Sequence, residues 1–156
     1  MKKTLTLSLA LILFLTSMPN LCGQTNPYDK YLAVADIEKV TGLSDLKQVP
    51  REPRKGAGGH LNFADKNGSM ILTVSFLTAQ EYGFYRNEKR MLKATIPGVG
   101  DGAMTGPAAD PQYMFLARKG DKCVALSTFV DPANPEKTLL TMDQLIALGK
   151  IVVERL

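Results

Sequence analysis

The sequence predicts an α+β fold in which helices pack on one face of an antiparallel sheet. Two stretches, 60–77 and 113–130, each contain two runs of β-forming residues around a turn signal. This pattern predicts two β-hairpins. Segments with helical periodicity precede, separate and follow the hairpins, and the last of them, 141–156, is amphipathic. Paired strands punctuated by helices favour an antiparallel sheet with a helical layer.

The first 23 residues have the composition of a secretory signal peptide. Lys2 and Lys3 precede an apolar run over 5–15, and a polar, proline-containing break follows. A positive start, an apolar run of about 7–15 residues and such a break are typical of export signals, whereas a membrane-spanning helix needs about 20 apolar residues. The alternative is a buried N-terminal helix. We therefore expect a periplasmic or secreted protein whose mature chain begins at Gln24.

Cys22 leaves a second location open, because a lipid on this cysteine would anchor the protein to a membrane. Bacterial lipoprotein signals usually place leucine three residues before the cysteine. Here Pro19 occupies that position and Leu21 directly precedes the cysteine. We expect a membrane as a partner only if Cys22 is lipidated.

The mature chain is long enough for one domain. Removing 23 of the 156 residues leaves 133, and the formal net charge falls from +4 to +2 because two lysines leave with the signal. The remaining charges are interspersed and form no basic stripe, so we expect no nucleic-acid partner. We expect 24–34 to be a flexible, exposed lead-in and 35–156 to be a single α+β domain.

The elements before the second helix each have a local signal. A short helix is predicted within 35–43, with Gly42 where a helix ends. A strand is expected at 46–50, and a basic loop rich in proline and glycine follows over 50–59. The first hairpin is expected to turn tightly at Asn67-Gly68, with positive φ at both residues.

The second helix is expected over 78–94, where Thr78 and Glu81 have capping-box spacing. It contains three aromatic residues within four positions, which one helical face cannot accommodate. At least one of them is therefore expected to be exposed or to line a groove. We take these aromatic residues as a candidate binding surface: Tyr82, Phe84 and Tyr85.

The second hairpin is expected to turn at 119–121, and a proline-rich loop is expected at 131–138. Cys123 lies in an apolar run of the hairpin, which predicts a small buried residue on a strand. The alternative is a disulfide with Cys22, if processing retains that residue.

A glycine-rich loop at 96–104 contains Gly98, Gly100 and Ala103 at the spacing of a dinucleotide-binding fingerprint. Such a loop must follow a strand and open a helix. Here it follows a predicted helix, and no helix is predicted after it. We expect the glycines to provide positive φ in a turn toward the sheet, and Asp101 to bond its own neighbouring backbone. We expect no cofactor.

Two short motifs resemble a group of small exported bacterial domains. One is D-x-x-x-V-x-G at 36–42, the other is P-G-x-G-D at 97–101, and the resemblance extends over most of 35–156. Many members of that group are lipoproteins, and most have no assigned activity. The resemblance implies an α+β fold and an exported, non-enzymatic role, and it carries no catalytic residues.

The sequence contains few residues suited to catalysis. His60 is the single histidine, there is no C-x-x-C or H-E-x-x-H, and we expect no metal site. A serine triad would need His60 as its base. Ser69 is the nearest serine in sequence, and no G-x-S-x-G elbow occurs. Asp101 and Asp110 are the candidate carboxylate pair.

We therefore expect a non-catalytic binding or accessory domain of a bacterial envelope, whose partner is an envelope protein or a small ligand. Besides the aromatic residues of the second helix, Asp101 is a candidate binding residue. The alternative is a small secreted hydrolase that uses His60 or the Asp101/Asp110 loop.

Overall fold

The computed structural model describes residues 26–50, 58–88, 94–109 and 112–156. The expected signal peptide, Cys22 and Asp110 lie outside these residues, as does most of the basic loop at 50–59. No helix in the described part of the chain has both the length and the apolar character needed to cross a membrane.

The core of the fold is an antiparallel sheet. Its strands are β1 (Lys47–Val49), β2 (His60–Ala64), β3 (Met70–Leu77), β4 (Ala94–Ile96), β5 (Gly102–Ala109), β6 (Gln112–Lys119) and β7 (Lys122–Thr128). Within the described residues the sheet has seven strands in the order β1-β2-β3-β7-β6-β5-β4. Both predicted hairpins are present as β2–β3 and β6–β7, and the short strand expected near 46–50 is β1.

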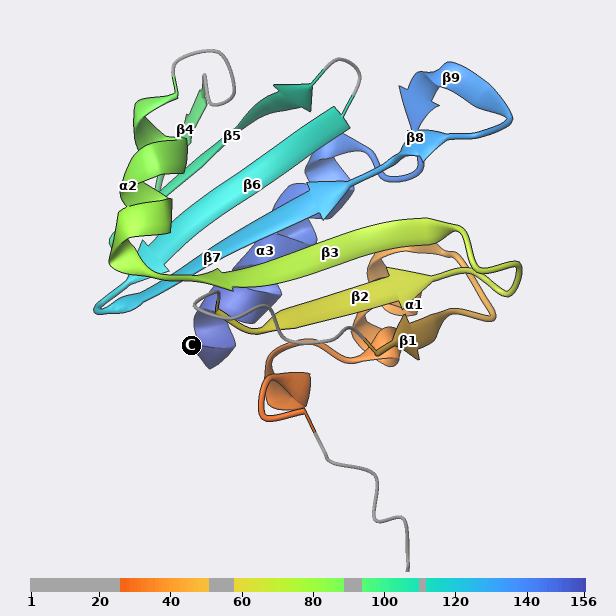
Figure 1. Ribbon diagram of the computed structural model, residues 1–156, viewed down its shortest axis with the longest axis horizontal. Helices are drawn as coiled ribbons and strands as arrows, with labels where there is room; N and C mark the ends of the chain where they lie inside the picture. The colour runs from red at the N-terminus through yellow and green to blue at the C-terminus, as the bar shows by residue number, and fades with distance from the viewer. Residues whose placement is uncertain (1–25, 51–57, 89–93, 110–111) are drawn as a thin grey trace, which may run out of the picture.

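Helices cover both faces of this sheet (Figure 1). They are α1 (Val34–Thr41), α2 (Ala79–Asn87) and α3 (Met142–Arg155). The α+β class, the antiparallel sheet and the C-terminal helix are confirmed. The arrangement differs from the expected single helical layer, because α1 and α3 lie on one face and α2 lies on the other.

The residues of β6 show how both faces are buried. Phe115 and Ala117 belong to the core cluster on the face covered by α3, which we call the α3 face. Met114 and Leu116 belong to the cluster with Tyr82 of α2, on what we call the α2 face. Because successive side chains of a strand point to opposite sides, an apolar run such as this one supplies two hydrophobic layers.

The α3 face holds the larger core. The Thr141 hydroxyl accepts from the Gln144 amide at 3.2 Å, and the Gln144 side chain accepts from the Thr141 amide at 2.9 Å, so the predicted capping box is confirmed. The helix then buries one apolar side against β6 and β7. Its buried residues are Leu145, Leu148, Gly149, Val152 and Val153.

The α2 face holds a smaller cluster that contains Cys123. The side chain is a free cysteine at 4% exposure, which confirms the predicted buried strand position. Burial raises the pKa of the Cys123 thiol, because the charged thiolate is poorly solvated there. The thiol is therefore held in its neutral, unreactive form at neutral pH.

The expectation of an exposed N-terminal segment over 24–34 is wrong for Tyr31 and Leu32, which are buried, whereas Asp29, Lys30 and Ala33 are exposed as expected. The 3₁₀ turn η1 (Asp29–Tyr31) packs on the sheet, and Leu32 is fully buried. The ring of Tyr28 stacks on Phe76 with centroids 4.3 Å apart, and the ring of Tyr31 lies 5.0 Å from Phe76. Residues three apart share one side of a 3₁₀ turn, so the two tyrosines reach the same apolar surface.

The first hairpin turn is less tight than expected. Only Gly68 has positive φ, at 90°, and the loop runs over 65–69. The Asp65 carboxylate accepts from the amides of Asn67 (2.9 Å) and Ser69 (2.8 Å). An aspartate that bonds backbone amides ahead of it stabilises a longer turn than a primed two-residue one.

Two further element predictions are wrong. Helix α2 ends at Asn87, and Ala94 lies in strand β4, which pairs with β5. The stretch expected as a proline-rich loop forms a two-stranded ribbon of β8 (Val130–Asp131) and β9 (Asn134–Thr138). The prolines are tolerated there because a two-stranded ribbon leaves one side of each strand without a ladder partner.

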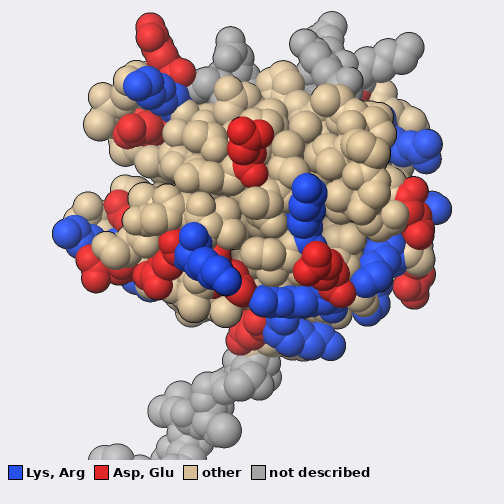
Figure 2. Space-filling model, turned by 180° about the vertical axis from the view of Figure 1, so that it is seen from behind, with Lys and Arg blue, Asp and Glu red and all other residues tan. Residues whose placement is uncertain are grey.

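Acidic and basic side chains are mixed on the α3 face (Figure 2). They gather over its lower half, while the upper half carries few charges. One bidentate pair is formed by Arg155 of α3 and Asp36 of α1, with N···O distances of 2.6 and 2.9 Å. The hydrogen bonds from Arg155 lower the pKa of Asp36 below its ordinary value of 3.8.

Asp36→Asn is expected to lower the free energy of unfolding by about 1 kcal/mol or less at neutral pH, because the pair is exposed to solvent. A carboxylate whose pKa is lower in the folded state than in the unfolded chain stabilises the fold at pH values above the unfolded-state pKa, which is near 3.8. This contribution disappears as the pH falls through the folded-state pKa. Denaturant unfolding of wild type and variant should therefore converge at acid pH. Glu136→Gln, an exposed change on β9, is the matched control, and a difference that persists below the folded pKa would contradict the assignment.

Candidate functional site

Helix α2 brings two of the three predicted aromatic residues to the surface. Its first turn is fixed by a capping box between Thr78 and Glu81, in which the two side chains accept from each other's backbone amides at 3.2 and 2.8 Å. Tyr82 is buried at 9% exposure, Tyr85 is half-buried, and Phe84 is 67% exposed. The prediction that one aromatic residue must be exposed is confirmed.

Phe84 and Tyr85 form a contact that we call the α2 aromatic pair. Their ring centroids lie 5.7 Å apart at an interplanar angle of 76°, an edge-to-face arrangement. Tyr85 also packs against the apolar cluster of the α2 face. Tyr82 points into that cluster and anchors the helix, so it takes no part in the exposed surface.

His60 lies beside a serine that sequence reasoning did not select. Its Nδ1 is 3.0 Å from the Oγ of Ser75, its direct cross-strand neighbour in the β2–β3 hairpin. Ser69, the nearest serine in sequence, sits in the hairpin loop. In a hairpin that turns at Asn67-Gly68, successive residues on either side of the turn pair with each other, and this register places His60 opposite Ser75. The contact could therefore have been predicted from the predicted hairpin.

The His60–Ser75 pair has part of the chemistry of a hydrolase. A histidine within hydrogen-bond reach of a hydroxyl can accept its proton and activate the oxygen as a nucleophile. Both residues lie within strands, without the sharp strand-to-helix turn that exposes a nucleophilic serine. The part of the chain that the structure describes contains no group of three His, Cys, Asp or Glu side chains placed to hold a metal ion.

Asp101 acts as a structural clamp. Its carboxylate accepts from the Gly120 amide at 2.6 Å, and its own amide donates to the Arg118 carbonyl at 2.8 Å. The expected bond to its neighbouring backbone is therefore wrong, because the carboxylate reaches across to the β6–β7 turn. Asp110 lies outside the described residues, so the proposed Asp101/Asp110 pair stays a prediction.

The glycine loop has the predicted backbone geometry. Gly98 and Gly100 adopt positive φ of 72° and 55°. The loop connects β4 to β5, so it follows a strand and not the expected helix, and the element after it is also a strand. A phosphate cradle of the dinucleotide-binding type needs a helix N-terminus after the loop, and β5 does not provide one.

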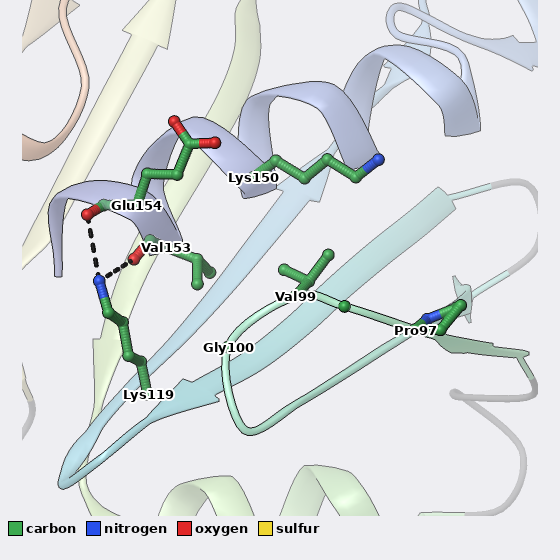
Figure 3. A pocket seen from close by; sticks show the side chains of 8 residues that line it. Pro97, Val99, Gly100, Lys119, Lys150, Val153 and Glu154 are labelled. Atoms are coloured by element: carbon green, nitrogen blue, oxygen red, sulfur yellow. Dashed lines mark hydrogen bonds between the residues drawn. The ribbon is translucent and has the colours of Figure 1, made fainter.

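The glycine loop also forms one wall of a cavity of about 330 Å³, which we call the loop–helix cleft (Figure 3). The other wall is the second half of α3. The cleft is lined by Pro97, Gly98, Val99, Gly100, Lys119, Lys150, Val153 and Glu154. Neither lysine was selected from the sequence, because their proximity depends on how α3 packs beside the β6–β7 turn.

Comparison with known proteins gave no matching family model, no similar curated protein and no similar solved structure.

Proposed function

We propose that this chain is an exported protein of a bacterial envelope that acts as a non-catalytic binding or accessory domain, with the α2 aromatic pair as its contact to an envelope protein. The observation that carries the proposal is the 67% exposure of Phe84. Among the described residues, Leu43 is the other large apolar side chain that is exposed, at 37%. Aromatic side chains of this kind are the usual anchors of protein interfaces.

The surroundings of Phe84 favour a binding role. Tyr82 and Tyr85 fix α2 to the sheet through the apolar cluster of the α2 face. Phe84 is thereby presented on an ordered helix, in edge contact with a second ring. A side chain that is already held in its binding position loses little conformational entropy when it binds. More of the free energy gained by burying it in a partner's pocket therefore contributes to affinity.

The test compares Phe84→Ala with Leu43→Ala as a matched control. The mature chain, residues 24–156, is immobilised and exposed to envelope extract of the producing organism, and retained proteins are quantified by mass spectrometry. A partner should be retained by wild type and by Leu43→Ala, and Phe84→Ala should weaken its binding about 30-fold or more. Both variants should unfold within about 0.5 kcal/mol of wild type. If no retained protein depends on Phe84, the proposal is wrong.

Export is part of the proposal, and it is supported by the composition of residues 1–23. Intact mass and cell fractionation of the protein from its own host test it. A chain that begins at Gln24 in the periplasmic or secreted fraction agrees with a free domain. Added lipid mass on Cys22, with recovery in the membrane fraction, would identify an anchored form. A full-length cytoplasmic chain would contradict export.

A second candidate function is that of a small secreted hydrolase, with Ser75 as nucleophile and His60 as base. The observation that favours it is the 3.0 Å contact between His60 Nδ1 and Ser75 Oγ. A fluorophosphonate probe should then label Ser75, and His60→Gln should abolish the labelling. Equal labelling of Ser75 and of Ser127, a half-buried serine on the same face of the sheet, would remove this candidate. The Asp101 loop is less suited to catalysis, because its carboxylate is engaged with Gly120.

A further inference from the structure

The loop–helix cleft has an apolar base between its two walls. Val99 of the glycine loop is 6% exposed and Val153 of α3 is 4% exposed, and both belong to the core cluster of the α3 face. Their side chains face each other across the cleft (Figure 3). A volume of about 330 Å³ is at the lower end of the range for small-molecule sites. The cleft therefore fits a small ligand with an apolar body.

The two lysines of the cleft have different roles. Lys119 Nζ donates to the carbonyl oxygens of Val153 and Glu154 at 3.0 and 3.1 Å, at the C-terminal end of α3. These carbonyls form the negative end of the helix dipole, so Lys119 compensates charge that would otherwise repel an anion. Lys150 makes no hydrogen bond or ion pair with any described residue. Its ammonium group is therefore available to a ligand.

The acidic residue of the cleft does not oppose an anion. Figure 3 shows the Glu154 carboxylate pointing away from the glycine loop, while Lys150 extends along α3 above Val99 and Pro97. The amides of Gly98 and Gly100 donate to no acceptor in the described part of the chain. The backbone has positive φ at Gly98 and Gly100 but not at Val99 between them. Loops in which the sign of φ alternates in this way typically have amides that favour anions.

We propose that the loop–helix cleft is a binding site for a small organic carboxylate. The carboxylate pairs with the Lys150 ammonium, and the apolar part of the ligand packs on Val99 and Val153 at the base of the cleft. This site goes beyond the proposed function, because it lies on the α3 face, opposite the α2 aromatic pair. An outcome at one site leaves the proposal for the other unchanged.

The test uses hexanoate as the anionic probe and hexanamide as its neutral counterpart of similar shape, each titrated into the ¹⁵N-labelled mature chain. Hexanoate should shift the amide resonances of Gly98, Val99, Gly100 and Val153. Lys150→Gln should weaken hexanoate binding about threefold to fivefold at low ionic strength, to the level of hexanamide, since an exposed ion pair contributes modestly. The difference should shrink at high salt, because the pair is screened.

Lys137→Gln, on the exposed ribbon β8–β9, is the matched control and should bind hexanoate as wild type does. Two results would overturn the proposal. One is hexanoate titration that leaves the four amide resonances unmoved. The other is hexanamide, or the Lys150→Gln variant, binding as tightly as wild type binds hexanoate, which would show that no charge is recognised.

Discussion

Gly100→Ala is expected to lower the free energy of unfolding by about 2–4 kcal/mol. Two costs combine at this position. The residue has φ of 55°, a conformation that strains any residue with a Cβ atom. A Cβ atom would also lie 2.3 Å from the carbonyl oxygen of Arg118 and 3.2 Å from Val153. The first contact is to backbone of β6, which cannot rotate away as a flexible side chain would.

Gly98→Ala separates these two costs. Its φ of 72° produces similar strain, but a Cβ atom there would meet nothing within 4 Å. We therefore expect a loss of about 1–2 kcal/mol, from backbone strain alone. Urea unfolding of both variants measures the difference. Equal losses would mean that the loop moves away from Arg118 at little cost, which would contradict the clamp formed by Asp101 and Gly120.

Sequence patterns predicted those elements whose signals are local. Thr78 and Thr141 begin helices with capping boxes, and the C-terminal end of α1 is fixed by Gly42, whose φ is 73°. These features depend on residues within one turn of each other. The packing of η1 was missed because Tyr28 is buried by contact with Phe76, which lies far along the chain. Nothing in the local sequence distinguishes such a turn from an exposed one.

The position of α2 was predictable in part. The runs 114–117 and 123–126 are continuously apolar, which is typical of strands buried on both faces. A single helical layer would leave the apolar side chains on one face of β6 and β7 exposed to solvent. The continuous apolar runs therefore indicate a second layer on that face. The burial of Met114 and Leu116 against α2 supplies it.

The candidate sites differ in how far the sequence defines them. The exposed aromatic residue on α2 followed from helical geometry, and the partner of His60 follows from hairpin register. The loop–helix cleft has no such local signal. Lys150 is one of several lysines in the sequence, and it differs from Lys119 because tertiary packing leaves its ammonium without an acceptor in the described structure.

Gly149→Ala is expected to lower the free energy of unfolding by about 2 kcal/mol, although alanine is the better helix former. A Cβ atom at this position would lie 2.5–2.6 Å from three atoms of the Phe115 ring. That ring is fully buried and cannot swing out. Overpacking costs about 1–3 kcal/mol or more, which exceeds the gain of about 1 kcal/mol in helix propensity.

Gly83→Ala makes the same chemical change in α2, where a Cβ atom would meet nothing within 4 Å. It should raise the free energy of unfolding by about 0.5–1 kcal/mol. Thermal or urea unfolding should therefore give opposite signs for the two substitutions. Phe115→Leu should recover part of the loss at Gly149 in the double variant, because a smaller side chain leaves room for the methyl group. Val153 follows Gly149 by one helical turn, so the approach of α3 that the glycine permits also sets the width of the loop–helix cleft.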